Sequence, residues 1–293
     1  MNDERKRKPR PSGGGRPSGG GRPSGEGRAR GDRPGRPGDD RRSGPRGGAG
    51  ARGGAGARRP RPEPEVRTAD QQIYDGPPIP DDISAKDLDR QVRDQLRSLP
   101  EKLADRIAKH LVMAGLLIEE DPERAYLHAL AARARSQRNA VIREAVGETA
   151  YAAGKFAEAL AELRTARRLS GRQDYAPMMA DCERALGRPE KALEYDTPKV
   201  REALDQAGNV ELTIVVAGAR RDLGQISAAL NLLESEPLHS PAREDWVARL
   251  RYAYADTLLS ADRRDEAIEW FHRTVAVDGN AVTDAEARLA ELT

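Results

Sequence analysis

An alanine on an apolar helix face recurs along this chain at a nearly constant interval, and this spacing constrains the fold more than any other feature. Ala125 is followed by Ala159, Ala192, Ala229 and Ala267, at steps of 34, 33, 37 and 38 residues. A small side chain lets a second helix approach closely, so a repeated one predicts similar helix pairs stacked in a row. The two longer steps predict longer turns. In three units the turn predicted before the alanine also has a glycine five residues upstream, at Gly154, Gly187 and Gly224.

The rest of the chain from Ser84 onward follows a helical pattern. The apolar residues of "EKLADRIAKHLVMAGLLI" recur at the spacing of one helix face. The segment "ELTIVVAGARR", residues 211–221, resembles a strand, but its flanks favour a helix. No other run of alternating β-branched residues occurs, so the sequence predicts an all-α fold.

Helix starts are predicted where a capping side chain precedes an acidic residue or a proline. The predicted starts are Ser84 with Asp87, Ser98 with Glu101, Asp121 with Pro122, Ser240 with Pro241, and Thr283 with Glu286.

These repeats resemble the tetratricopeptide repeat family, whose unit is a helix–turn–helix of about 34 residues. The best match runs through Gly147, Tyr151, Gly154, Ala159 and Ala166. The resemblance implies a right-handed superhelical solenoid of helix hairpins over residues 105–280. Residues 84–104 would form leading helices, and residues 281–293 a capping helix. The positions expected to pack within and between repeats are Gly147, Gly154, Ala159, Ala166, Gly187, Ala192, Gly224, Ala229 and Ala267.

In this family the first helix of each unit lines a concave groove that binds a peptide. Carried over by position, the resemblance implies a groove lined by Glu144, Glu148, Tyr151, Asp181, Arg184, Arg221, Asp222, Tyr252 and Asp256. Tyrosine and arginine are common interface anchors, which favours binding. The competing interpretation is a solvated helix face, because charged surface residues are the norm. Many members hold a ligand carboxylate with Lys and Asn, but acidic or apolar residues stand at those places here.

The N-terminal part has a different composition, and residues 1–70 are predicted to be a disordered basic arm. Residues 1–65 lack Val, Ile, Leu, Phe, Trp and Tyr, and contain 18 of the 28 glycines. Such a segment cannot bury enough apolar surface to fold. Its 18 basic and 8 acidic residues give +10, so the remaining chain carries −8 to reach the total of +2. Arginine in this arm favours non-specific nucleic-acid contact, and the competing interpretation is a solubilising tail.

The segment "QQIYDGPPIPDDI", residues 71–83, is predicted to be an extended, proline-rich strap, because its prolines oppose a helix. Two interpretations remain open for its apolar residues. They pack on the first helices, or they form a short linear motif that a partner recognises.

No residue constellation of the kind that catalysis needs is found in the sequence. The four histidines show no metal-ligand spacing, and Cys182 is the single cysteine, which fits a reducing compartment. Phosphate-loop, zinc-protease and serine-hydrolase motifs are absent from the sequence. We therefore predict a protein without enzymatic activity, metal or cofactor.

The sequence predicts a cytoplasmic adaptor whose groove binds a peptide or helix of another protein. Its apolar runs are too short to cross a membrane, and no secretory signal follows the initial methionine. The alternative is an RNA- or ribosome-associated factor tethered by the basic arm. A third hypothesis is self-assembly through the repeat faces.

Overall fold

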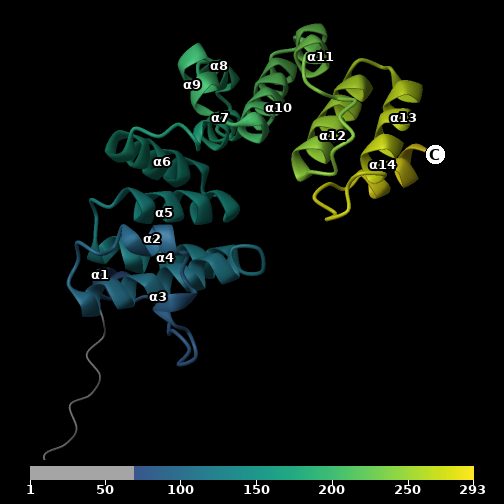
Figure 1. The fold of residues 1–293 in the computed structure, drawn as a ribbon. Coiled ribbons are helices and arrows are strands. Elements are labelled where there is room, and N and C mark those ends of the chain that lie inside the picture. The colour runs from purple at the N-terminus through teal and green to yellow at the C-terminus, as the bar shows by residue number, and fades with distance from the viewer. Residues whose placement is uncertain (1–68) are drawn as a thin grey trace, which may run out of the picture. The chain divides into compact units, whose positions relative to one another are not determined.

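The computed structural model describes residues 69–293, so nearly all of the predicted arm lies outside the described residues. In this part of the chain the fold is entirely helical, which confirms the predicted all-α class (Figure 1). The helices are α1 Ala69–Asp75, the 3₁₀ helix η1 Ala85–Asp87, α2 Arg90–Asp94, α3 Glu101–Leu117, α4 Pro122–Arg135, α5 Ala140–Ala152, α6 Phe156–Ser170, α7 Ala176–Ala185, α8 Pro189–Leu193, α9 Pro198–Ala203, α10 Gln206–Asp222, α11 Ile226–Glu234, α12 Asp245–Ser260, α13 Arg264–Val275 and α14 Ala285–Leu292.

Five pairs of helices follow one another along the chain, and the two members of each pair pack together. The pairs are α3/α4, α5/α6, α7/α8, α10/α11 and α12/α13. Each pair also contacts the next, through α4 with α5, α6 with α7, α7 with α10, and α11 with α12. The two long steps of the sequence repeat have structural counterparts, because the short helix α9 lies in the first and the loop of residues 235–244 in the second.

The five alanines of the sequence repeat occupy equivalent places in these pairs. Each lies on the second helix of its pair, and each has 0% of its surface exposed. The alanine spacing therefore marks the buried side of α4, α6, α8, α11 and α13. Ala166, one turn before the end of α6, is also buried.

Gly147 has the packing role that the sequence predicts. A Cβ atom at this position of α5 would lie 2.5 Å from the side chain of Leu163 on α6. No real Cβ contact is that short, so α5 and α6 can approach to their observed separation only because residue 147 lacks a side chain. The Leu163 side chain is itself fully buried.

Gly154, Gly187 and Gly224 do not have the predicted packing role, because no atom lies within 4 Å of a Cβ placed at any of them. They lie in the turns where the sequence places them, with φ of 69°, 71° and 72°. This left-handed conformation is strained for residues with a side chain, and it closes the end of the preceding helix. The residue after each glycine donates its N–H to a carbonyl five residues back, as from Lys155 to Ala150 at 2.8 Å.

Asp262 takes the same left-handed place in the turn between α12 and α13, with φ of 58°. Arg263 N donates to Leu258 O at 3.0 Å, the same hydrogen bond as in the three glycine turns. We expect Asp262→Gly to raise the free energy of unfolding by about 0.5–1 kcal/mol, because it removes the left-handed strain. Gly224→Ala is the matched control and should lower it by about 1 kcal/mol. Urea unfolding followed by circular dichroism tests this, and a loss of stability in Asp262→Gly would contradict it.

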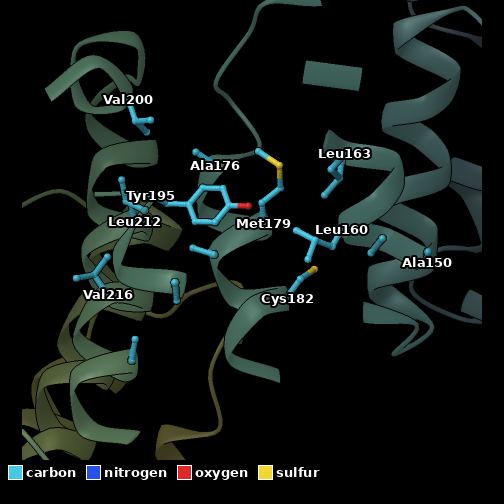
Figure 2. Packing of buried hydrophobic residues seen from close by; sticks show 14 residues of the cluster. Ala150, Leu160, Leu163, Ala176, Met179, Cys182, Tyr195, Val200, Leu212 and Val216 are labelled. Carbon is cyan, nitrogen blue, oxygen red and sulfur yellow. The ribbon is translucent and has the colours of Figure 1, made fainter. Parts of the chain in front are cut away.

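The apolar core continues from one pair to the next. Figure 2 shows its central part, where Met179 and Cys182 of α7 lie between Leu160 and Leu163 of α6 and the α10 side chains. Cys182 is fully buried, and burial raises the pKa of its thiol to about 12. A thiol held in this state is a packing group and not a nucleophile.

The predicted helix starts are confirmed at two places. Ser84 and Asp87 form a capping box, although the element they cap is the 3₁₀ helix η1. Asp121 caps α4, since its Oδ1 accepts the N–H of Arg124 at 3.0 Å.

At the three other predicted starts the predicted capping side chain is wrong, although α3 and α14 begin within two residues of the predicted positions. No side chain caps α3, whose N-terminal flanking residue is Pro100 and not Ser98. Helix α12 begins at Asp245, because Ser240 forms a local turn in which its Oγ accepts the N–H of Ala242. Helix α14 begins at Ala285, because the Thr283 hydroxyl donates to Asp278 Oδ2 at 2.6 Å instead of capping the helix.

The predicted extended strap is also partly wrong, because α1 covers residues 69–75. The first proline of this segment is Pro77, and it restricts the backbone of only the residue before it. The helix therefore continues to Asp75, and the chain turns at Gly76 with φ of 67°. Helix α1 packs on α4. A Cβ at Gly76 would lie 2.5 Å from Ala131 Cβ and 2.8 Å from His110 Cε1, so the chain after α1 is held tightly against α3 and α4.

Candidate functional site

The nine residues predicted to line a groove all lie on the first helices of four successive pairs. Helix α5 carries Glu144, Glu148 and Tyr151; α7 carries Asp181 and Arg184; α10 carries Arg221 and Asp222; and α12 carries Tyr252 and Asp256. We call these nine residues the first-helix face.

Side-chain hydrogen bonds on this face join each first helix to the next. The Tyr151 hydroxyl on α5 donates to Asp181 Oδ2 on α7 at 2.6 Å. Arg184 then donates to Asp181 Oδ1 at 3.0 Å and, across to α10, to Asp222 Oδ2 at 2.9 Å. From Tyr151 to Asp222 the face is therefore linked by hydrogen bonds, and these side chains are not solvated independently of one another.

The network has a second branch toward the C-terminus. Arg221 on α10 donates to Asp256 Oδ2 on α12 at 2.5 Å. The other oxygen of Asp256 accepts from Arg288 on α14 at 3.2 Å. Two contributors were missed in the sequence: Arg288, and Gly218, where a Cβ would lie 2.5 Å from the Arg184 guanidinium. Gly218 lies within the apolar part of α10, where a glycine is unfavourable, and this could have indicated a close contact.

The two tyrosines are held in place from both ends. The Tyr151 ring packs edge-on against Phe156, with ring centroids 5.7 Å apart, and the Tyr252 ring packs similarly against Phe271 at 5.5 Å. Burial, followed by the nearby carboxylate of Asp181 or Asp284, raises the pKa of each phenol above its usual range. Both phenols are therefore neutral donors, and they are oriented before any ligand binds.

Two hollows open among these residues. One, of about 600 Å³, lies between α7 and α10 and is lined by Asp181, Arg184, Ala185, Gly187, Pro189 and Asp222. The other, of about 370 Å³, lies between α2, α3 and α5, and Glu144 and Glu148 line it. We call the second hollow the Glu144 cavity. Its walls from α2 and α3 were not predicted from the sequence.

The two carboxylates of the Glu144 cavity are in different states. Glu148 accepts a hydrogen bond from the Tyr175 hydroxyl, whereas Glu144 has no hydrogen-bond donor among the described residues. Only 7% of the Glu144 surface is exposed. Burial raises the pKa of both carboxyls, and Arg172 partly opposes this at Glu144. The Glu144 oxygens are not among the fully buried polar atoms without a partner, so the carboxylate is open to the cavity and free to accept a donor there. Titratable groups in concave, partly enclosed sites mark functional sites more often than others do.

A buried histidine pair was also missed. His110 on α3 and His128 on α4 are fully buried, and their Nδ1 atoms are 3.0 Å apart. No sequence pattern marks this pair, because the two residues are 18 positions apart on different helices. Their Nε2 atoms have no hydrogen-bond partner. Across residues 69–293, no group of three or more histidine, cysteine or acidic side chains is placed to hold a metal ion, so the pair lacks further ligands.

A scan against protein-family models and a search of curated proteins find no match to this chain. No helix within the described range 69–293 has the length and apolar character needed to span a membrane.

Proposed function

We propose that residues 105–280 form a tetratricopeptide-like solenoid that acts as a non-catalytic, cytoplasmic adaptor. In this proposal the first-helix face is its binding groove, and an extended peptide or a helix of another protein lies across α5, α7, α10 and α12. The equivalent placement of the five buried alanines supports the repeat assignment, as do the four equivalent turns that end at Gly154, Gly187, Gly224 and Asp262.

One observation carries the proposal. Five of the nine residues of the first-helix face line two separate hollows, of about 370 and about 600 Å³, which are sizes typical of ligand sites. The hollows lie on successive first helices, so one extended ligand can place a side chain in each of them. The ordered hydrogen bonds between the helices favour binding as well, because a preorganised face loses little conformational entropy on association.

The test blocks the larger hollow. Ala185 lines it and is exposed, so Ala185→Trp fills it without disturbing the core. Ala157→Trp, at an exposed position on the second helix α6, is the matched control. We expect the full chain and Ala157→Trp to capture the same proteins from nuclease-treated native lysate, and Ala185→Trp to capture about tenfold less of them. Equal capture by Ala185→Trp would contradict the proposed groove. Proteins that are captured from untreated lysate but not from nuclease-treated lysate would favour the RNA-associated alternative.

A further inference from the structure

The Glu144 cavity is chemically specific as well as concave. Asp89, Glu144 and Glu148 line it together with one basic residue, Arg172, so its lining carries an excess of negative charge. Arg172 does not neutralise Glu144 through a hydrogen bond, because its Nε donates to Asp174 Oδ2 at 2.7 Å. Asp89 already has hydrogen-bond donors within the protein, since its Oδ1 accepts the N–H groups of Gln91 and Val92 at the start of α2.

Glu144 is therefore the group in the cavity that still needs a partner. Only 7% of the residue's surface is exposed and it lines the cavity, where its carboxylate oxygens stay accessible and no protein donor reaches them. Glu148 follows it by four residues on α5, so both carboxylates lie on the same helix side one turn apart. Glu148 receives only the Tyr175 hydroxyl and keeps acceptor capacity for a second donor.

Gln91, Gln95, Thr149 and Tyr175 add polar groups to the walls. Apolar side chains form the other part, and these suit a long aliphatic stem. Val92 from α2, Leu111 from α3 and Val141 from α5 line the cavity with the two glutamates. A side chain with an apolar stem and a planar, multiply donating cationic end matches this combination. Arginine has that structure, and its guanidinium can bond two carboxylates at once, which an ammonium does less well.

We propose that the Glu144 cavity binds the side chain of an arginine on a partner peptide, with the guanidinium paired to Glu144 and Glu148. This inference rests on the proposed function, since the rest of the peptide lies along the first-helix face. It goes further in naming the chemistry of one anchor position.

The test uses three synthetic peptides that differ at one position: Gly-Gly-Arg-Gly-Gly with blocked ends, and its citrulline and lysine counterparts. Isothermal titration of the full chain should give saturable binding of the arginine peptide. Citrulline keeps the shape of arginine without its charge, so we expect its Kd to be at least about tenfold higher. Lysine should bind with intermediate affinity. Free arginine should bind more weakly than the peptide, because the peptide backbone adds contacts on the face.

The matched variants are Glu144→Gln and Glu190→Gln, the second being an exposed glutamate of α8 that lines neither hollow. Glu144→Gln should raise the Kd of the arginine peptide about tenfold and raise the melting temperature of the free protein, because it removes an unpartnered buried charge. Glu190→Gln should change neither quantity. Equal binding of arginine and citrulline peptides, or unchanged binding by Glu144→Gln, would overturn the proposal. If Ala185→Trp no longer captures the partners but the arginine peptide does not bind as expected, the proposed groove is supported and only the arginine assignment is wrong.

Discussion

Replacing Gly147 with alanine is expected to lower the free energy of unfolding by about 3 kcal/mol, at the upper end for one added methyl group in a packed core. The new Cβ would lie 2.5 Å from two atoms of the Leu163 side chain, and Leu163 is fully buried on α6. The clash must be relieved by moving α5 away from α6 or by forcing Leu163 out of its rotamer. Both responses disturb the contact between the two helices of one pair.

The matched control is Gly115→Ala on α3. Gly115 is also a helical glycine, but no atom lies within 4 Å of a Cβ placed there. Alanine is favoured over glycine in a helix by about 1 kcal/mol, so this variant should be more stable than the parent. Urea unfolding of both variants gives opposite signs if the close contact at Gly147 is real. A stabilised Gly147→Ala would show that α5 and α6 are farther apart than the structure has them.

The sequence was sufficient to predict the all-α class and the buried alanine on the second helix of each pair, because both depend on local spacing. The alanine interval located the second helix of each pair, and the small residue at Gly147 located a close approach. The turn glycines were correctly placed in turns but were also assigned a packing role that they do not have. The sequence does not distinguish a glycine needed for a left-handed φ from one needed for close packing. Only the backbone conformation shows that Gly154 is of the first kind and Gly147 of the second.

Features formed by residues from separate helices were beyond sequence reasoning. Glu144 and Glu148 were predicted to face a groove, but their enclosure depends on α2, whose Gln91 and Val92 line the same cavity. The hydrogen bonds from Tyr151 to Asp181 and from Arg184 to Asp222 span 30 and 38 residues. Local periodicity places each residue on a helix face, but it does not say which side chain on the next helix it meets.

The histidine pair predicts a strong dependence of stability on pH. Burial is the main cause that lowers the pKa of His110 to about 3 and that of His128 to about 4, from an ordinary value of 6.5. Repulsion adds to this, because His110 faces His128, Arg135 and Arg106, and His128 faces Arg124. Asp75 of α1 acts on Arg135, and no carboxylate is among the groups that shift the pKa of either histidine.

The sign follows from proton binding in the two states. Below pH 6.5 the histidines of the unfolded chain are protonated, whereas the folded pair stays neutral until the pH falls to about 4. The unfolded state therefore binds more protons in this window. The stabilisation is complete above pH 6.5 and is lost as the pH falls, at up to about 1.4 kcal/mol per pH unit for each histidine.

Urea unfolding between pH 7 and pH 5 tests this, in a range where most carboxylates do not titrate. We expect the parent chain to lose about 2–3 kcal/mol per pH unit toward pH 5, because both buried rings contribute. His128→Gln should reduce the slope by about half, and His110→Gln with His128→Gln should nearly abolish it, whatever their stability at pH 7. His272→Gln, at an exposed position on α13, should keep the parent slope. A parent chain whose stability is flat from pH 7 to pH 5 would mean that the two rings are reached by water and are not buried together, and helix α1, held through Gly76 against His110, would then not be seated on α3 and α4 as the structure places it.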